Sequence, residues 1–280
     1  MNDLVLWLNG HLVPAAEAHV SPFDHGLLVG DGVFETLRVY DGVPFAWTRH
    51  HERLLRSADG LGLPVPASRE LRAAVDAVLS ANGLTDARIR LTVTGGPMPP
   101  GSERADAPPT VLIMAGAPTP FAPTIDVVTV PWTRNERGAV TGLKTTSYAE
   151  NVRALAFARE RGGGEAIFLN TRGELCEATG SNLFVVGDGV VRTPAGNAGC
   201  LLGVTRALVL ELCAEHGIPA EEDALAPTAL GEADEAFLTS STREVQAIAH
   251  ADGHPLPAPG PTTAKIAGLF TELVARDPDP

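Results

Sequence analysis

Hydrophobic periodicity changes several times along the first 117 residues, from the alternation of strands to the spacing of helices and back. Alternating stretches predict strands over residues 4–14, 33–47, 87–95 and 110–116. Asn9-Gly10 and Asp41-Gly42 interrupt the first two stretches, and both dipeptides are typical of β-hairpin turns. A helical spacing begins at Thr48, and Ser68 is expected to cap a second helix. This part of the chain is therefore predicted to be an α+β domain.

A second pattern of the same kind follows a proline-rich stretch. Residues 116–124 contain three prolines and no periodicity, which is typical of a linker. We predict a small N-terminal α/β domain at 1–117, a linker at 118–124 and a large C-terminal domain at 125–280. In the second domain, the apolar residues 139–144 are expected to form a strand that ends at Lys144, and a helix is expected over Tyr148–Arg161.

Composition and charge exclude several classes of protein. The net charge is −13 at pH 7, and no dense basic patch occurs, so nucleic acid and anionic membrane surfaces are disfavoured partners. No apolar run approaches the roughly 20 residues that span a bilayer, and the first ten residues lack a secretory pattern. Cys176, Cys200 and Cys213 have no CxxC spacing, which fits a reducing cytoplasm. We expect a cytoplasmic protein, and no metal site, because His50-His51 lack partners at metal-ligand spacing.

Lysine is scarce in this chain, since only two of the 21 basic residues are lysines, Lys144 and Lys265. Arginine cannot replace lysine as an amine nucleophile because its guanidinium stays protonated. Lys265 lies in an amphipathic pattern and is expected on the exposed side of a helix. Lys144 follows an apolar stretch, and apolar surroundings lower the pKa of a lysine, which favours the neutral amine that attacks carbonyls. Lys144 is therefore the candidate nucleophile.

Three further elements have the chemistry to hold a phosphorylated aldehyde. Glu177 lies in a mostly uncharged strand, where a carboxylate needs a cationic partner. Gly203-Val204-Thr205 opens a helix, and the free N–H groups and dipole of a helix N-terminus favour a phosphate. The segment 239–242 offers hydroxyl donors at the end of a strand. Together with Lys144, these elements supply an amine, an anion and a phosphate-binding surface.

Six motifs follow one another along nearly the whole chain. They are FDHGLLVGDGVFETLRVYDG, RHHERLLRSADGLGL, GLKTTSYAENVRAL, GELCEATGSNLFVV, LLGVTRALV and EAFLTSSTREVQAI. In this order they resemble the fold-type IV pyridoxal-phosphate enzymes, or class IV aminotransferases. That family comprises branched-chain aminotransferases, D-amino acid transaminases, (R)-amine transaminases and aminodeoxychorismate lyases. The resemblance implies an α+β fold of two α/β-type domains of the D-amino acid transaminase-like kind, with the cofactor in the interdomain cleft, and a homodimer.

The resemblance also implies roles for individual residues. Lys144 would form a Schiff base with pyridoxal 5'-phosphate and move the proton at the substrate's α-carbon. Glu177 would pair with the protonated pyridine nitrogen, and Arg53 matches the family's phosphate-binding arginine. The other implied cofactor contacts are Tyr148, Val204, Thr205, Ser240 and Ser241. Tyr148 is a candidate to hydrogen-bond the phenolic oxygen of the cofactor, with a core aromatic as the alternative.

Two reactions of the family fit these motifs. A transaminase would move an amino group between an amino acid, with D-amino acids included, or an (R)-amine and a 2-keto acid. The alternative is a 4-amino-4-deoxychorismate lyase that releases pyruvate and 4-aminobenzoate, and KTTSYAEN is similar to that subgroup. The segment 94–106 lacks the arginine–histidine carboxylate trap of D-amino acid transaminases, and Arg104 is the candidate substitute. Phe34 and Glu35 are further candidate substrate-binding residues, and we predict the transaminase.

Overall fold

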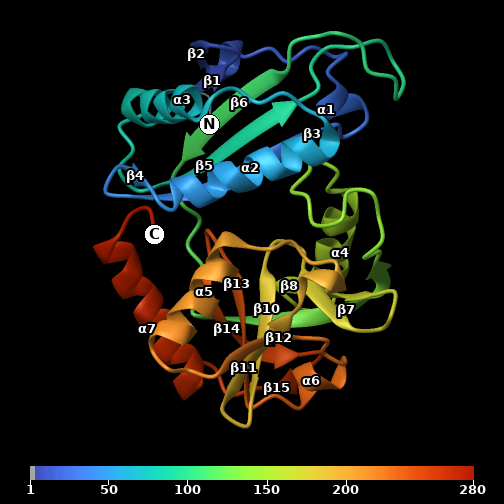
Figure 1. The fold of residues 1–280 in the computed structure, drawn as a ribbon, viewed down its shortest axis with the longest axis vertical. Coiled ribbons are helices and arrows are strands. Elements are labelled where there is room, and N and C mark those ends of the chain that lie inside the picture. Colours follow the sequence, from blue (N-terminus) through green and yellow to red (C-terminus); the bar gives the residue numbers. More distant parts are fainter. Residues whose placement is uncertain (1–3) are drawn as a thin grey trace. The chain divides into compact units, whose positions relative to one another are not determined.

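Contacts among the described residues, 4–280, divide this computed structural model into two units (Figure 1). Unit 1 contains the described residues up to Thr119, together with Leu143–Tyr148 and Pro278–Pro280. Unit 2 contains Pro120–Gly142 and Ala149–Asp277. The chain passes from unit 1 to unit 2 inside the predicted linker at 118–124, but two later segments belong to unit 1. One of these segments carries Lys144.

Unit 1 is built on a six-stranded antiparallel sheet with the strand order β2-β1-β6-β5-β3-β4. The strands are β1 (Val5–Leu8), β2 (His11–Pro14), β3 (Gly32–Tyr40), β4 (Val43–Pro44), β5 (Ala87–Thr94) and β6 (Thr110–Gly116). Both predicted hairpins form. Asn9 and Gly10 have φ angles of 48° and 97°, and Asp41 and Gly42 have φ angles of 50° and 82°. Positive φ at both central residues is the geometry that suits two-residue hairpin turns.

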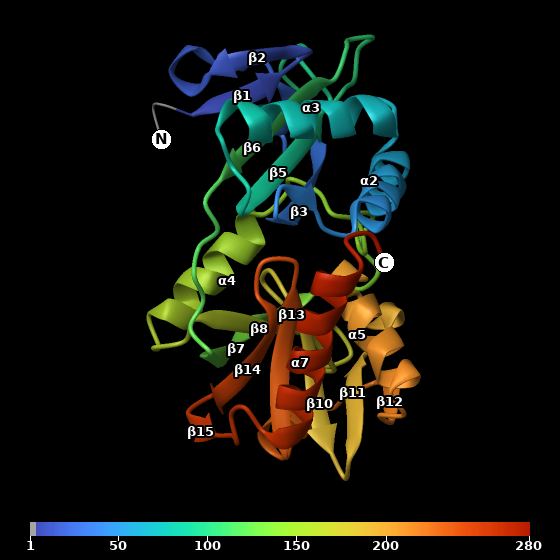
Figure 2. The same ribbon diagram turned by 90° about the vertical axis from the view of Figure 1, so that its left-hand side faces the viewer.

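Helices cover one face of the unit 1 sheet. They are α2 (Trp47–Leu61) and α3 (Ser68–Ala81), while the short η1 (Ala15–Glu17) and α1 (His25–Leu28) lie in the loops. Figure 2 shows α3 across the strands; it packs on β1 and β6, and α2 packs on β3. The predicted cap at Ser68 is wrong: Ala67 is the N-cap, and the Ser68 hydroxyl accepts a hydrogen bond from the Trp47 indole at 3.2 Å. The Ser68 side chain, predicted from the local pattern to cap the helix, therefore binds Trp47 of α2 instead.

Unit 2 contains a nine-stranded mixed sheet with the order β12-β11-β10-β13-β14-β7-β8-β9, and β15 pairs with β14. Its strands are β7 (Thr124–Arg134), β8 (Glu165–Asn170), β9 (Leu175–Ala178), β10 (Asn182–Gly187), β11 (Val190–Pro194), β12 (Ala220–Asp223), β13 (Glu235–Ser240), β14 (Glu244–Ala251) and β15 (His254–Pro255). The pairs β11–β12, β14–β7 and β7–β8 are parallel. The two sheets with their helices confirm the predicted α+β class.

The unit 2 sheet is buried on both faces. Its helices are α4 (Ala149–Arg159), η2 (Gly196–Ala198), α5 (Val204–Glu215), α6 (Thr228–Gly231) and α7 (Pro261–Arg276). On β8, Phe168 packs with Ala154 of α4, whereas its neighbour Ile167 packs with Leu230 of α6 on the other face. Lys265 is exposed on α7, as predicted. No helix among residues 4–280 has the length and apolar character to span a lipid bilayer.

The segment that carries Lys144 is not the strand that its apolar residues predict. Strand β7 ends at Arg134, and the residues that follow form turns, with an isolated bridge between Thr145 and Val33. Leu143, which contributed to the apolar pattern, packs against Gly60 of α2, so close that a Cβ on Gly60 would lie 2.7 Å from it. The apolar pattern here reflects contact with a helix more than 80 residues away, and not a strand.

Candidate active site

Lys144 is held through its backbone on both sides. Its N–H donates to the Ser57 hydroxyl at 3.0 Å, and its carbonyl accepts from the Phe34 N–H at 3.1 Å. The Thr146 N–H donates to the Gly32 carbonyl at 2.8 Å, so this short segment runs alongside the first residues of β3. These bonds fix a lysine that lies outside any helix or strand.

The side chain of Lys144 lies beside an aromatic pair. Its Nζ is 4.5 Å from the centroid of the Phe34 ring, and the Tyr148 ring meets the Phe34 ring edge-on, with centroids 5.2 Å apart. The Arg90 guanidinium on β5 lies 3.5 Å from the centroid of the same Phe34 ring. Two basic side chains and a phenol ring therefore lie around one buried aromatic ring.

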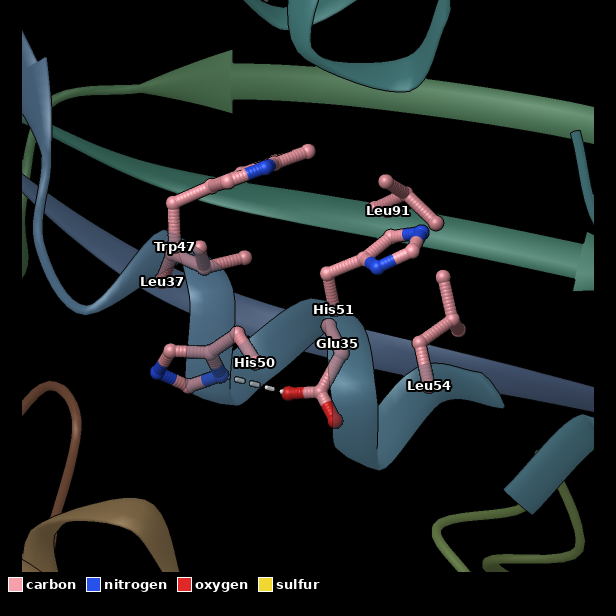
Figure 3. A pocket seen from close by; sticks show the side chains of 7 residues that line it. All are labelled: Glu35, Leu37, Trp47, His50, His51, Leu54 and Leu91. Carbon is pink, nitrogen blue, oxygen red and sulfur yellow. Dashed lines mark hydrogen bonds and ion pairs between the residues drawn. The ribbon is translucent and has the colours of Figure 1, made fainter. Parts of the chain in front are cut away.

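A buried ion pair lies on the opposite face of β3. Glu35 follows Phe34, so its side chain points to the other side of the sheet, toward α2. The Arg53 guanidinium donates to both oxygens of the Glu35 carboxylate, through Nε at 2.8 Å and Nη2 at 2.7 Å. His50 Nδ1 lies 2.7 Å from the same carboxylate (Figure 3). Phe34 and Glu35, both predicted to bind substrate, thus face different surroundings.

The protonation of Glu35, His50 and Arg53 depends on the contacts among these three residues. Burial by itself raises the pKa of Glu35, but the charge and hydrogen bonds of Arg53, with those of His50, hold the pKa of Glu35 far below its usual range. Burial lowers the pKa of His50, against the opposing effect of Glu35. Burial also opposes the charge of Arg53, yet Glu35 raises the pKa of Arg53. At neutral pH, the cluster therefore contains a carboxylate, a guanidinium and a neutral imidazole that donates from Nδ1.

Arg53 keeps part of its donor capacity. Its Nη1 makes no hydrogen bond among residues 4–280, while Nε and Nη2 are occupied by Glu35. A cavity of about 10 Å³ next to the cluster is lined by Glu35, Leu37, Trp47, His50, His51, Leu54 and Leu91 (Figure 3). That volume holds about one water molecule, so this cavity is not a substrate site.

Arg104 is engaged elsewhere in unit 1. Its guanidinium donates to both oxygens of the Asp31 carboxylate, at 2.9 and 2.5 Å, and its Nη1 donates to the Leu61 and Gly62 carbonyls at the end of α2. This arrangement occupies Arg104 with protein groups and joins the loop before β3 to α2. The carboxylate-binding role predicted for Arg104 has no support in these contacts.

In unit 2, Glu177 on β9 is fixed by groups on both oxygens. Its Oε2 accepts a hydrogen bond from the Leu201 N–H at 2.9 Å, and its Oε1 lies 3.5 Å from Nε of Arg134. The Arg134 guanidinium lies 4.3 Å from the centroid of the Phe168 ring. Arg134 is the cationic partner that the uncharged sequence around Glu177 requires.

The residues predicted to bind phosphate in unit 2 lie at the start of α5. Val204 and Thr205 are buried in its first turn, where no side chain caps the backbone amides. Gly203 lets this turn approach β10 closely, because a Cβ on Gly203 would lie 2.1 Å from the Asn182 side chain. An uncapped first turn of a helix attracts an anion through its N–H groups and its dipole.

Hydroxyl groups at the end of β13 add to this surface. Thr239 is 1% exposed, and its hydroxyl has no hydrogen-bond partner among the described residues. Ser240 accepts a hydrogen bond from the Arg243 N–H at 3.2 Å, and Ser241 lies in the turn that follows. An unpartnered buried hydroxyl next to an uncapped helix fits a bound phosphate group. The amides and hydroxyls of unit 2 thus suit a phosphate group, the Glu177 carboxylate suits a protonated ring nitrogen, and the Lys144 amine of unit 1 suits an aldehyde, which are the three groups of pyridoxal 5'-phosphate.

Three residues of the site were not identified from the sequence. His50 and Ser57 share one face of α2 with Arg53, at spacings of three and four residues, and that spacing was the available signal. Arg90 alternates with the core residues of β5 and so lies on the outer face of the sheet with Phe34. The sequence around Arg90 does not distinguish it from an ordinary exposed arginine. Its place in the site depends on the Lys144 segment, which lies 54 positions later in the chain.

Comparison with known proteins places these features in context. The model of the amino-transferase class IV family matches residues 32–251. The chain is 31% identical over 287 residues to D-alanine aminotransferase of Listeria innocua, and the match covers 96% of both proteins.

Solved structures show the same similarity. Branched-chain aminotransferase from Thermoproteus uzoniensis, solved with norvaline, has a TM-score of 0.91 and 34% identity, covering 97% of this chain and 94% of that one. Branched-chain amino acid aminotransferase from T.th., complexed with N-(5'-phosphopyridoxyl)-L-glutamate, has a TM-score of 0.91 and 28% identity, covering 99% and 96%.

Proposed function

Because the chain belongs to the class IV aminotransferase family, we propose that it transfers amino groups between α-amino acids and 2-keto acids. The observation that carries this proposal is the fixed backbone of Lys144, which holds its amine beside the Phe34 ring that Tyr148 and Arg90 also contact. The protein is a pyridoxal 5'-phosphate enzyme, as are its relatives.

Each group of residues has a separate task in this proposal. Bound pyridoxal 5'-phosphate supplies an electron sink for the negative charge that develops at the substrate's α-carbon. Lys144 holds the aldehyde and moves the proton at that carbon, while Glu177 keeps a proton on the ring nitrogen. Arg53 and the first turn of α5, at Val204 and Thr205, bind the phosphate.

Arg90 is proposed to bind the substrate carboxylate. No ion pair between Arg90 and an aspartate or glutamate occurs within the described part of the chain, and the only hydrogen bond of its side chain there is to the Thr92 hydroxyl at 3.4 Å. Burial, opposed by Tyr148 and helped by the neighbouring Arg88, lowers the pKa of Arg90. A half-buried cation without an acidic partner is stabilised by an anionic ligand. This need for a carboxylate favours amino acids over simple (R)-amines.

Replacement of Arg90 tests this assignment. We expect Arg90→Met to lower kcat/KM for amino acids by about 10- to 100-fold, because charge-assisted hydrogen bonds to the carboxylate are lost. The visible band of the lysine-bound cofactor should remain, since Lys144 is untouched. Arg72→Met, which removes an arginine on α3 paired with Asp76, is the control and should leave kcat/KM unchanged. An Arg90→Met enzyme with wild-type kcat/KM for amino acids would exclude this role.

The donor is identified by an absorbance titration. The cofactor-loaded protein is mixed separately with L-leucine, L-glutamate, D-alanine, D-glutamate and (R)-1-phenylethylamine. Conversion of the visible band to the near-ultraviolet band of the amine form shows transamination, and the responding donor gives the stereochemistry. If no donor converts the band, the transaminase proposal fails, and pyruvate release from 4-amino-4-deoxychorismate becomes the assay for the lyase.

We further propose that the enzyme is a homodimer. Five large apolar residues within ten positions of unit 1 are at least 43% exposed: Val20, Phe23, Leu27, Leu28 and Val29. Such a concentration of exposed apolar side chains marks an interaction surface, and a second copy of the chain covers it in this proposal. Light scattering should give twice the mass of one chain, and Leu27→Glu should give a monomer. A wild-type monomer at micromolar concentration would contradict it.

A further inference from the structure

Helix α2 lacks its own N-terminal cap. Its N-cap residue, Ala46, has a φ angle of 53° and offers no side-chain acceptor, and the first turn contains no acidic residue. A helix that begins in this way leaves backbone N–H groups without partners and its dipole without a compensating charge. The start of α2 therefore depends on groups from elsewhere in the chain.

The last three residues of the sequence supply those groups. The Asp279 carboxylate accepts from the Thr48 N–H at 2.8 Å and from the Thr48 hydroxyl at 2.6 Å. The Pro278 carbonyl accepts from the Ala46 N–H at 2.8 Å, and the Pro280 carbonyl accepts from Nε of Arg49 at 2.6 Å. All of these contacts lie within unit 1. Asp279 thus performs the function of an N-cap for a helix that begins 232 positions earlier in the chain.

The capped helix supports several parts of the site. From its buried face, Arg53 binds Glu35, His50 contacts the same carboxylate, and Ser57 accepts the hydrogen bond from the Lys144 backbone. Arg53 lies in the second turn of α2, close enough to its N-terminus to be affected by fraying there. A loss of order at Thr48 would reach His50 and Arg53 before the rest of the helix.

We propose that Asp279 is a positioning residue for cofactor binding, which it supports by capping α2 and thereby holding Arg53 in place. This inference rests on the proposed function, since Arg53 matters to the cofactor only as a phosphate-binding residue. It assigns a role in the site to a residue that touches neither substrate nor cofactor and that lies far from every cofactor-binding motif in the sequence.

The test separates phosphate binding from general stability. Dissociation constants are measured for pyridoxal 5'-phosphate and for pyridoxal, which lacks the phosphate, in the wild type, Asp279→Ala and Asp279→Asn. We expect Asp279→Ala to weaken pyridoxal 5'-phosphate binding by about fivefold, the effect of a lost N-cap, with pyridoxal changed by less than about twofold. Asparagine caps helices nearly as well as aspartate, so Asp279→Asn should bind both within about twofold of the wild type.

A second cap in the same chain provides the matched control. Glu235 accepts hydrogen bonds from the Thr262 and Thr263 N–H groups at the start of α7 in unit 2. Glu235→Gln should lower the melting temperature without changing the ratio of the two dissociation constants. If the wild type binds cofactor but Asp279→Ala leaves the ratio of the two dissociation constants unchanged, the positioning role is overturned. The same holds if Glu235→Gln changes that ratio as much as Asp279→Ala does. A wild type that binds no pyridoxal 5'-phosphate would overturn the proposed function, and the positioning role with it.

Hydrogen exchange on the cofactor-free protein tests the cap itself. Asp279→Ala should accelerate exchange of the amides in the first turn of α2 by about fivefold, while those of α7 stay unchanged. Equal exchange rates in the wild type and Asp279→Ala would show that Asp279 does not order the start of α2. This result would hold independently of the measured cofactor affinities.

Discussion

Replacement of Lys144 by alanine is expected to abolish both the visible band of the bound cofactor and amino-group transfer. No other described group in unit 1 offers a primary amine, because the chain's only other lysine, Lys265, is exposed on α7 of unit 2. That amine would hold the cofactor's aldehyde and move the proton at the α-carbon, so turnover should fall by more than about 10⁴-fold. Absorbance spectra of the loaded protein and single-turnover rates measure the two effects separately.

Lys265→Ala is the matched control for this substitution. Its side chain is exposed, so the variant should keep the visible band and wild-type turnover. Retained activity in Lys144→Ala, or loss of the visible band in Lys265→Ala, would show that the nucleophile has been assigned to the wrong lysine. Lys144→Arg should behave like the alanine variant, because a guanidinium keeps the charge but supplies no nucleophilic amine.

Replacement of Glu35 by glutamine is expected to have the largest effect on stability. The amide cannot carry the negative charge that the Arg53 guanidinium requires, and Arg53 is only 5% exposed. Removing one partner of a buried pair leaves an uncompensated charge, so the free energy of unfolding should fall by about 3–5 kcal/mol. Urea denaturation at pH 7 measures this change.

Two further variants control for the chemistry of the substitution. Asp76→Asn breaks the exposed pair between Asp76 and Arg72 on α3 and should cost no more than about 0.5 kcal/mol. The double variant Glu35→Met with Arg53→Met removes both buried charges and should recover most of the stability lost in Glu35→Gln. Equal losses in Glu35→Gln and Asp76→Asn would contradict the buried-pair assignment.

The pH dependence of the same pair has a defined sign. In the folded protein, the pKa of Glu35 lies below its unfolded value near 4.3, so its contribution to stability is present above about pH 4.3. That contribution is lost as the pH falls toward the lower, folded pKa. The difference in unfolding free energy between the wild type and Glu35→Gln should therefore be constant from pH 8 to pH 6 and shrink below about pH 4.3. A difference that stays constant down to pH 3 would contradict this assignment.

The elements with strong local patterns could be predicted from the sequence. Asn9-Gly10 and Asp41-Gly42 have turn chemistry that depends on two residues alone, and both hairpins form. The uncapped first turn of α5 was also visible, because Gly203 and the apolar residues that follow are contiguous in the chain. In each case, the determining interactions lie within a few residues.

Features built from distant segments could not be predicted in the same way. The Lys144 segment owes its conformation to Ser57 and Phe34, which are 87 and 110 positions away, and its local apolar pattern suggested a strand. Arg104 lies inside the segment 94–106 where the carboxylate trap was expected, but its partner Asp31 comes from a loop 73 positions earlier. The sequence motifs identified the residues that carry the chemistry. The hydrogen bonds that hold these residues join distant segments, and hydrophobic periodicity does not predict such contacts.

The alternation of β3 has a consequence for the way in which this enzyme can change over evolutionary time. Phe34 faces Lys144 and Arg90, whereas Glu35, one position later, faces Arg53 and His50. Thr36 and Thr92 lie on the Phe34 face, so substitutions there reshape the surroundings of the reacting amine without touching the buried carboxylate. Mutations on the Phe34 face can therefore change the surroundings of the reacting amine while the buried pair of Glu35 and Arg53 stays intact.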